Sequence, residues 1–384
     1  MDKNNPIMIS QTPLVQFGPG VMKNLGRQAR FLNMRKALVV TDEGIRRLGI
    51  LERVREGLES AGVATEIYSD VQVNPTDADV AAGVELFKRA GCDAVVAVGG
   101  GSPIDAGKAI RVLARCGGST EDYDITKGGI RKIPWDLPSM IAVPTTAGTG
   151  SEVTNAAVIT IQELREKISV LGAVLMPTFA LVDPEMSALM PASLTAATGM
   201  DALAHCIESY CVDRYCPPAD QAALGGMELV GRSLERAVRD GNDMDARIDM
   251  AMAALLGGMS FPQKGVGAAH ALSHPLSAAF GVPHGLANAI MLPYVMETNC
   301  PCVSAKLERI AACLTPDTRR AHDAAGIVRG LSKEIGLPQR LSEVGVKEDA
   351  FDLLAQRAAK DISLSGNPVR LSVEELKTLY LRAF

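Results

Sequence analysis

Three of the five histidines of the chain, His270, His274 and His284, lie within one short stretch, AAHALSHPLSAAFGVPHG at residues 268–285. Histidine is intermediate in burial and ordinarily scattered, so a local cluster of imidazoles indicates a metal site or a proton-transfer site. His270 and His274 are four residues apart, which places both side chains on one face of a helix. His284 follows a Gly-Val-Pro break and is expected to begin the next helix.

A second segment, TGMDALAHCIES, carries a carboxylate and an imidazole at the same spacing, Asp201 and His205. One carboxylate with two or three imidazoles is a ligand set suited to a divalent first-row metal. For a single histidine a place in the core is the more ordinary interpretation, but four of the five histidines with a matched aspartate favour a metal site. The spacing makes His270 and His274 the natural helical pair and leaves open whether His284 is a third ligand or a bystander.

A glycine-rich turn connects an apolar strand to a helix in AVVAVGGGSPIDAGKAI, where GGGS at residues 99–102 precedes Pro103 in the first helical turn. Glycines let a ligand approach the backbone, and exposed amides at a helix N-terminus attract phosphate oxygens. A pyrophosphate fits such a turn. Neither G-x-G-x-x-G nor the Walker A pattern matches, because Ile104 and Ala109 stand at required positions, so a nucleoside triphosphate hydrolase is disfavoured. A tight turn without a ligand is the alternative interpretation.

A second polar turn, VPTTAGTGSEVT at residues 143–154, ends another predicted strand. Open parallel sheets bind ligands beyond the carboxyl ends of their strands, and this turn would line that edge with hydroxyl groups. Asp42 ends the strand LVVTD, where a carboxylate accepts hydrogen bonds from ribose hydroxyls and repels a 2′-phosphate. The two turns and this aspartate predict a dinucleotide site that prefers NAD to NADP.

The elements that must position these motifs divide the chain into two halves. The runs KALVVTD, ATEIYSD, DAVVAVGGG and SMIAVPTT alternate with helical patterns, and such continuous apolar runs are typical of strands buried on both faces of a parallel sheet. After FALVDPEMSALMP, segments rich in Ala, Leu and Met at helical spacing take over. The sequence predicts a doubly wound α/β domain over residues 1–187 and an all-helical domain over residues 188–384.

Composition and charge limit the partners. The chain of 384 residues is 47% hydrophobic and 22% charged, as soluble globular proteins are. Its net charge of −5 offers no broad basic surface for nucleic acid or anionic lipid. The polar start MDKNNPIMISQTPLVQFGPG does not match a signal peptide, and the sequence has no apolar run long enough for a membrane span. We therefore expect small-molecule partners, no nucleic acid, no membrane and a cytoplasmic location.

Four motifs, in this order and spacing, resemble the iron-dependent (group III) alcohol dehydrogenases: GGGSPIDAGKA, PTTAGTGSEVT, GMDALAHCIE and HALSHPLSAAFGVPHGLANAIMLP. The resemblance extends from FGPG at residues 17–20 to GNPVRLSVEELKTLY at residues 366–380. It implies a dehydroquinate synthase-like architecture, with an α/β nucleotide-binding domain, a helical domain and an active site in the cleft between them. It also implies a homodimer or a higher homo-oligomer.

The resemblance also implies roles for individual residues. His274 is implied to be a catalytic histidine beside nicotinamide and substrate, and the implied metal ligands are Asp201, His205, His270 and His284. The implied NAD-binding residues are Asp42, Gly99, Gly100, Gly101, Ser102, Asp105, Thr145, Thr146, Thr149, Ser151, Val158 and Lys167. Iron(II) is the implied metal. Zinc(II), which binds such ligands more tightly than iron(II), and manganese(II) are the alternatives.

These assignments predict an NAD-dependent alcohol dehydrogenase. The metal polarises the substrate oxygen, and hydride passes between the carbinol carbon of a short-chain alcohol or hydroxy acid and nicotinamide. His274 or a ribose hydroxyl is the predicted proton relay. Phe261 and Asn367 are predicted to line the substrate pocket, as an apolar wall and a polar contact. They suit a short chain with a polar end, such as 4-hydroxybutyrate, and plain primary alcohols are the alternative.

Two other classes of function are alternatives. A metal-dependent lyase or hydrolase on a dehydroquinate synthase-like scaffold would share the two-domain build, but the motif that carries His270 and His284, together with PTTAGTGSEVT, argues against it. A non-catalytic sensor of metal or nucleotide is the third class, and the intact ligand set does not favour it.

Overall fold

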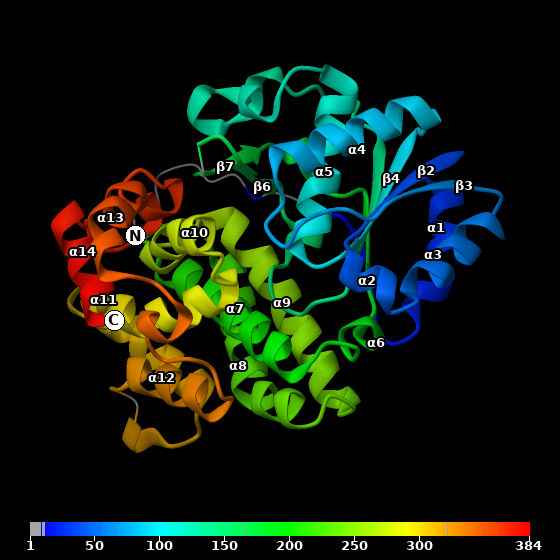
Figure 1. The fold of residues 1–384 in the computed structure, drawn as a ribbon. Helices are drawn as coiled ribbons and strands as arrows, with labels where there is room; N and C mark the ends of the chain where they lie inside the picture. Colours follow the sequence, from blue (N-terminus) through cyan, green and yellow to red (C-terminus); the bar gives the residue numbers. More distant parts are fainter. Residues whose placement is uncertain (1–8, 10–11, 165, 321) are drawn as a thin grey trace. The chain divides into compact units, whose positions relative to one another are not determined.

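The computed structural model describes residues 9, 12–164, 166–320 and 322–384, drawn as a ribbon in Figure 1. The described residues form two compact units. One contains residues 12–146, 151–164 and 166–189, and the other contains residues 9, 147–150, 190–320 and 322–384. We call them the sheet unit and the helical unit, and each is described by itself.

The sheet unit is built on six parallel strands in the order β1-β8-β5-β4-β2-β3. The strands are β1 (Leu14–Phe17), β2 (Lys36–Val40), β3 (Ala64–Tyr68), β4 (Ala94–Gly99), β5 (Ser139–Pro144) and β8 (Phe179–Val182). Strands β4 and β8 are buried along their whole length. The predicted parallel α/β fold is therefore confirmed, and the carboxyl ends of the strands meet at one edge of the sheet.

Helices cover both faces of this sheet (Figure 1). On one face, Val95 of β4 belongs to the same buried cluster as Ile110 of α5. On the other face, Val96 of the same strand shares a cluster with Leu58 of α3. The helices of the unit are α1 (Leu25–Phe31), α2 (Glu43–Arg47), α3 (Ile50–Glu59), α4 (Asp77–Ala90), α5 (Gly101–Cys116) and α6 (Pro184–Ser187). Because successive residues of a strand point to opposite faces, each central strand contributes to both cores.

Four strands of the structure have no counterpart among the four predicted ones. β1 lies at the edge of the sheet, where Leu14 is 57% exposed, and β8 lies beside it. The other two form an antiparallel hairpin, β6 (Ala156–Ile161) and β7 (Glu166–Leu171). Strands β1, β6 and β7 are only partly buried and lack the continuous apolar run on which the prediction depended, whereas β8 is such a run but has only four residues.

The helical unit has no strand within residues 190–320 and 322–384, which confirms the predicted all-helical second half. Its helices are α7 (Ala192–Cys211), α8 (Pro217–Arg239), α9 (Met244–Lys264), α10 (Ala268–Phe280), α11 (His284–Leu314), α12 (Ala324–Glu334), α13 (Phe351–Ala358) and α14 (Val373–Arg382). Helix α7 packs against α8, α9 and α11 and is buried on nearly every side. A helix that is buried on nearly every side lies inside a domain, so α7 is the centre of this unit.

The break between α10 and α11 follows from its residues. Helix α10 ends at Phe280, and Gly281 adopts the left-handed conformation with φ of 67° that favours glycine. Pro283 then precedes α11, which begins at His284 as predicted. Among the helices that the structure describes, none combines the length and the apolar character that crossing a membrane requires.

Candidate metal centre

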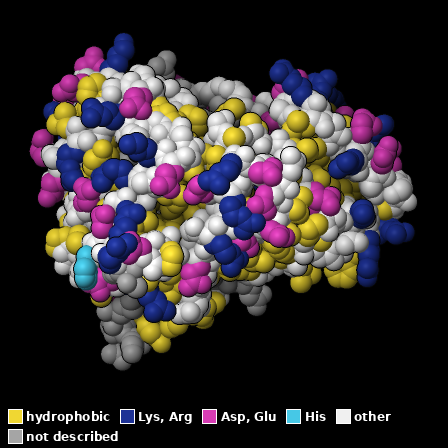
Figure 2. Space-filling model, turned by 90° about the horizontal axis from the view of Figure 1, so that it is seen from below, with side chains coloured by type: hydrophobic (Ala, Val, Ile, Leu, Met, Phe, Trp, Pro, Cys, Tyr) yellow, Lys and Arg dark blue, Asp and Glu magenta, His cyan; other side chains and the backbone are white. Residues whose placement is uncertain are grey.

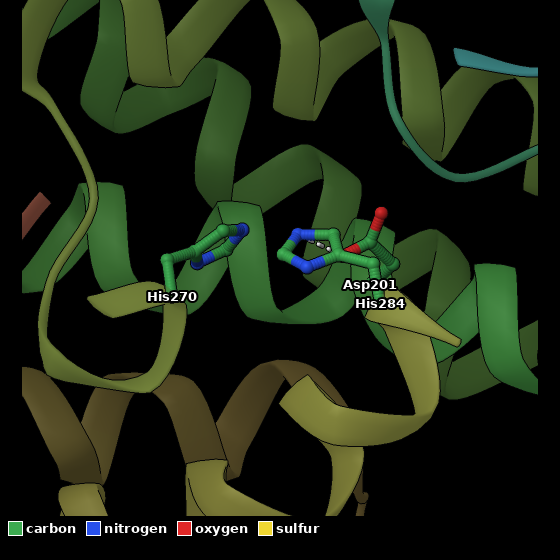
Figure 3. A group of neighbouring side chains, drawn as sticks. All are labelled: Asp201, His270 and His284. Carbon is green, nitrogen blue, oxygen red and sulfur yellow. Dashed lines mark ion pairs between the residues drawn. The ribbon is translucent and has the colours of Figure 1, made fainter. Parts of the chain in front are cut away.

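Side chains from three helices of the helical unit converge on one point (Figure 3). Asp201 comes from α7, His270 from α10 and His284 from the first residue of α11. One ligand atom of each side chain lies within 4.8 Å of the other two, and Nε2 of His284 is 3.6 Å from Oδ1 of Asp201. The structure thus brings together three of the four side chains that the resemblance assigns to a metal.

The amide of Asn288 shows where these three groups point. Its Nδ2 donates to Oδ1 of Asp201 at 2.8 Å and lies 3.3 Å from Nε2 of His270 and 3.2 Å from Nε2 of His284. Asn288 is fully buried and stands one helical turn after His284 on α11. Three atoms that can act as metal ligands therefore lie within 3.3 Å of one NH₂ group, which is the convergence that a divalent cation requires.

His205, the fourth predicted ligand, lies beside this group but outside the set of three. Its Nδ1 is 4.0 Å from Oδ2 of Asp201, and its ring centroid is 4.5 Å from that of His270. Phe261 of α9 stacks on the other side of the ring, with the centroids 4.5 Å apart and the planes at 17°. Phe261, predicted as an apolar wall of the substrate pocket, is thus in contact with His205, a predicted metal ligand.

The chemistry of these residues fits a divalent first-row cation. Burial lowers the pKa of His205 to about 4, so its ring is neutral near pH 7, the form in which histidine binds metals. Within the part of the chain that the structure describes, the buried Nδ1 of His205 has no hydrogen-bond partner. Such an atom ordinarily has one, so its isolation is consistent with a ligand role. One carboxylate and three imidazoles form an oxygen and nitrogen donor set of the kind that iron(II), zinc(II) and manganese(II) accept.

A close approach of two helices makes the convergence possible. Gly285 follows His284 in the first turn of α11 and lies against the backbone of α7. A Cβ at this position would be 2.9 Å from the carbonyl carbon of Ala197 and 3.1 Å from Cβ of Asp201. Only glycine lets α11 start this near to α7, and this approach brings His284 to Asp201.

His274 is next to the predicted ligands but is held by a different partner. Its ring lies parallel to that of His284, with the centroids 5.2 Å apart. Its Nδ1 is 2.6 Å from Oδ2 of Asp361, which lies 87 residues further along the chain. Burial alone would raise the pKa of Asp361, but His274 and the backbone of Ser363 hold it below the ordinary value. His274 therefore stands beside a charged carboxylate at the edge of the site.

Three side chains of the site were missed by the sequence analysis: Glu208, Asn288 and Asp361. Glu208 lies seven residues after Asp201 on α7, and its carboxylate is 2.5 Å from Nδ1 of His270. The spacing of Asp201, His205 and Glu208 places all three on one helical face, and this spacing is a sequence signal that could have identified Glu208. Asn288 is likewise four residues after His284. Asp361 carries no such signal, because only the fold brings it to His274.

The Glu208–His270 contact determines the charge of both groups. Burial alone would raise the pKa of Glu208, but the hydrogen bond from His270 and the backbone N–H groups of Gly267 and Ala269 lower it below the ordinary value. Burial would lower the pKa of His270, whereas Glu208 raises it above the ordinary value. The glutamate is therefore a buried anion beside the metal centre.

Asn367, predicted to line the substrate pocket, has a side chain engaged in internal contacts. It forms reciprocal 2.9 Å hydrogen bonds with Asn299, and its Nδ2 also donates to the carbonyl of Val369 at 2.8 Å. Its Oδ1 accepts from the backbone N–H of Ala268 at 3.2 Å. These contacts hold the first residue of α10, and a contact of Asn367 with substrate stays a prediction.

In the sheet unit, the two predicted polar turns lie side by side at the carboxyl edge. Gly99 ends β4 with φ of 151°, and its carbonyl accepts from the backbone N–H of Thr145 at 2.9 Å. A Cβ on Gly100 would lie 3.2 Å from the methyl group of Thr146. Gly101 begins α5, so the helix N-terminus opens directly onto this edge. This is the location at which parallel sheets bind nucleotides.

Asp42 and Ser102 belong to the same edge. Oδ1 of Asp42 caps α2 by accepting from the backbone N–H of Ile45 at 2.9 Å, and a Cβ on Gly99 would lie 3.3 Å from Oδ2 of Asp42. Ser102 donates to the carbonyl of Val73 at 2.5 Å. Asp42 therefore stands next to the glycine-rich turn, and its contact with the ribose of NAD stays a prediction.

Asp105 joins the two turns through a buried lysine. Its carboxylate accepts from the hydroxyl of Ser151 and, at 2.9 Å, from the backbone N–H of Val158. Nζ of Lys108 lies 3.6 Å from the carboxylate and donates to Ser151 at 2.9 Å and to Thr154 at 3.0 Å. Burial lowers the pKa of Lys108 to about 8. This network fastens α5 to the second turn and to β6.

The last predicted cofactor residues lie on other elements. Lys167 is opposite Thr160 in the β6–β7 hairpin. Thr149 belongs to the helical unit, within the segment 147–150. In that segment a Cβ on Gly150 would lie 2.6 Å from Cα of Gly258 in α9, so these residues pack tightly on the helical unit.

Comparisons with known protein families match both units. A sequence model described as iron-containing alcohol dehydrogenase matches residues 13–184. A second, described as the C-terminal part of the Fe-containing alcohol dehydrogenase family, matches residues 195–384. Together the two matches cover nearly the whole chain.

Individual relatives are similar over their full length. The 1,3-propanediol dehydrogenase of Klebsiella pneumoniae is 37% identical over 376 residues, which cover 96% of each chain. The 4-hydroxybutyrate dehydrogenase of Cupriavidus necator is 38% identical over 372 residues, covering 94% of this chain and 95% of that one. The crystal structure of a 1,3-propanediol oxidoreductase superimposes with a TM-score of 0.94 at 36% identity, covering 99% of this chain and all of the other.

Proposed function

The chain belongs to the iron-containing alcohol dehydrogenase family, and from this premise we propose that it interconverts a short-chain alcohol or hydroxy acid with the corresponding aldehyde or ketone. The cofactors of this reaction are NAD(H) and a divalent metal. The observation that carries the proposal is the convergence of Asp201, His270 and His284 within 4.8 Å of one another. The relatives named above are dehydrogenases, so the alternative of a lyase or hydrolase finds no support among them.

Four side chains would hold the metal in this proposal: Asp201, His205, His270 and His284. A bound divalent cation supplies Lewis-acid polarisation of the substrate oxygen. Iron(II) is the metal we propose, with zinc(II) and manganese(II) as alternatives that the same ligands accept. The walls around the ligands are apolar on the side of Phe261 and carry buried charge on the side of Glu208.

His274 is the residue that we propose moves the proton of the substrate hydroxyl. Asp361 engages its Nδ1 at 2.6 Å, which leaves Nε2 as the nitrogen available for exchange. The side chain is 15% exposed, so it is packed in place and still reaches solvent. A histidine between substrate and solvent is suited to general acid–base catalysis near neutral pH.

The carboxyl edge of the sheet unit is the proposed site of NAD(H). The amides at the start of α5 and the glycine-rich turn suit the pyrophosphate, and Asp42 suits the ribose hydroxyls. Because a carboxylate at this position repels a 2′-phosphate, we propose NAD as the cofactor. Thr145, Thr146, Ser151, Val158 and Lys167 are the other residues we propose around it, with Asp105 acting through its contacts to Ser151 and Val158.

The substrate we propose is a short chain that ends in a second polar group. Two relatives are named for such compounds, 1,3-propanediol and 4-hydroxybutyrate. Phe261 beside His205 supplies an apolar surface for the methylene groups. Residues 361–367, which carry Asp361, reach the same region through His274 and are a proposed source of contacts to the polar end.

Assembly and location are also proposals. On the face shown in Figure 2, basic and acidic side chains are interspersed and neither sign forms an extended area. A net charge of −5 with such mixing is consistent with small-molecule substrates rather than nucleic acid. We propose a homo-oligomer and a cytoplasmic location.

The decisive experiment is a chelator-sensitive assay. Protein reconstituted with iron(II) is incubated with NAD and a panel of short alcohols, diols and hydroxy acids, and absorbance of NADH is followed before and after chelation. We expect reduction of NAD that stops when the metal is removed. Product formation without reduction of NAD would indicate a lyase or hydrolase. Binding of metal and nucleotide without turnover of any compound would indicate a sensor, and either result would contradict the proposal.

A further inference from the structure

We propose that Glu208 is a positioning residue of the metal centre, whose carboxylate sets both the backbone position and the ring tautomer of His270. The inference deepens the proposed function and rests on it, since it concerns how one ligand of the proposed metal is presented. Glu208 itself is not a ligand in this account. It acts only through His270.

The first contact is with the backbone of α10. This helix begins after Gly267, which has no side chain to cap it. The carboxylate of Glu208, from α7, accepts from the backbone N–H of Ala269 at 2.6 Å and of His270 at 3.4 Å. These are among the first N–H groups of the helix, which have no partner inside it. Glu208 therefore caps α10 from a neighbouring helix. This contact fixes the position of the backbone of His270 relative to α7.

The second contact is with the ring. Oε2 of Glu208 is 2.5 Å from Nδ1 of His270, and both side chains are only 4% exposed. The carboxylate already accepts from two backbone N–H groups at the start of α10, so it is also the acceptor in this contact and the proton lies on Nδ1. A metal-binding ring carries one proton, and with that proton on Nδ1 the lone pair lies on Nε2, which is the nitrogen near Asp201 and His284.

An independent contact on the opposite side of the ring agrees with this tautomer. Nδ2 of Asn288 is 3.3 Å from Nε2 of His270, and an amide NH₂ group only donates. Nε2 is therefore placed as an acceptor, although the two hydrogens of this NH₂ group are also within reach of Asp201 and His284. The carboxylate on one side assigns the proton position, and the amide on the other side agrees with it.

The spacing on α7 explains why one helix supplies both a ligand and its support. Asp201 and Glu208 are seven residues apart, about two helical turns, and project from the same face. Because both residues lie on one buried helix, the helix geometry sets the separation of their backbone positions. His270 is thereby held at a fixed distance from Asp201.

The test compares the zinc affinity of Glu208→Gln with that of the wild type by competition with a chromophoric chelator. The amide oxygen of glutamine still caps Ala269, but its NH₂ group faces Nδ1 of His270 and favours a proton on Nε2. Loss of such a partner of a metal-binding histidine ordinarily costs about 10- to 100-fold in metal affinity. We expect a loss of this size, with the unfolding temperature in the presence of chelator close to that of the wild type.

The matched control is Glu297→Gln. Glu297 is a partly buried glutamate of α11 in the same unit, paired with Arg329 and Arg382. We expect its zinc affinity to equal that of the wild type. An unchanged affinity in Glu208→Gln would overturn the inference. So would a loss of affinity matched by a large fall in unfolding temperature with chelator present, because Glu208 would then only stabilise the fold.

A second measurement does not depend on the variant folding. Nitrogen-15 NMR of histidine-labelled, zinc-loaded wild-type protein reports which ring nitrogen of His270 carries the proton. A proton on Nδ1 is expected, and a proton on Nε2 would overturn the inference. Neither measurement requires turnover. If the protein binds zinc but oxidises no alcohol, the proposed function is contradicted, but the two measurements still test the role of Glu208.

Discussion

Replacing Gly285 with alanine tests whether the approach of α11 to α7 builds the metal centre. A Cβ at this position would overlap the carbonyl oxygen of Ala197, and it would lie 2.9 Å from the carbonyl carbon of Ala197 and 3.1 Å from Cβ of Asp201. Carbon atoms that are not bonded ordinarily stay about 3.5–4.0 Å apart. The start of α11 must therefore move away from α7 by about 1 Å or more. His284 is the residue before Gly285 and moves with it.

This displacement is large for a metal site, whose ligand distances hold to about 0.2 Å. We expect Gly285→Ala to bind zinc at least about tenfold more weakly, because one of the four proposed ligands, His284, is displaced. Overpacking of a buried contact also lowers the free energy of unfolding, here by about 1–3 kcal/mol. Chelator competition measures the affinity, and urea unfolding with chelator present measures the stability.

The control is Gly330→Ala in α12 of the same unit, where a Cβ would meet no atom within 4 Å. Alanine is the better helix former by up to about 1 kcal/mol, so this variant should be as stable as the wild type or slightly more stable. Its zinc affinity should not change. Wild-type affinity in Gly285→Ala, or an equal loss in Gly330→Ala, would refute the reasoning.

Three further predictions concern other parts of the molecule. His274→Ala should lower kcat by about 10²- to 10⁴-fold while metal content by elemental analysis stays normal, and loss of the metal would instead identify His274 as a ligand. Lys108→Met should lower the free energy of unfolding by roughly 3 kcal/mol in urea and weaken NAD binding in fluorescence titration, because the turns lose a buried link; an unchanged NAD affinity would contradict this. Burial raises the pKa of Glu152 from 4.5 to about 7, so the folded protein holds an extra proton in this window, and the free energy of unfolding should fall by roughly 3 kcal/mol as pH rises through it. Glu152→Gln should flatten that dependence, and identical pH profiles would count against a buried, titrating Glu152.

The pattern of residue types along the chain was sufficient to predict the parallel sheet, the helical second half and the two polar turns at the sheet edge. These features depend on local information. Buried strands have continuous apolar sequences, and the apolar residues of helices recur about every 3.6 residues. Glycine and proline mark where these elements end. The start of α11 at His284 after the Gly281–Pro283 break is one instance, and the one-turn spacing of Asp201 and His205 on α7 is another.

Contacts between elements that are distant in the chain carry no such local signal. Asp361 meets His274 across 87 residues, and Asn367 is engaged by Asn299 across 68. Neither pairing follows from periodicity, because a side chain's partner across an interface depends on how two elements pack and not on the residues beside it in the chain. The structure likewise brings Asp201, His270 and His284 together, whereas spacing had left open which histidines belong to the set. The sequence determines which chemical groups are available to the site. The distances between those groups are decided only when the helices pack. Hydrophobic burial is not directional, so the final positions depend on specific contacts such as that of Gly285 with Ala197.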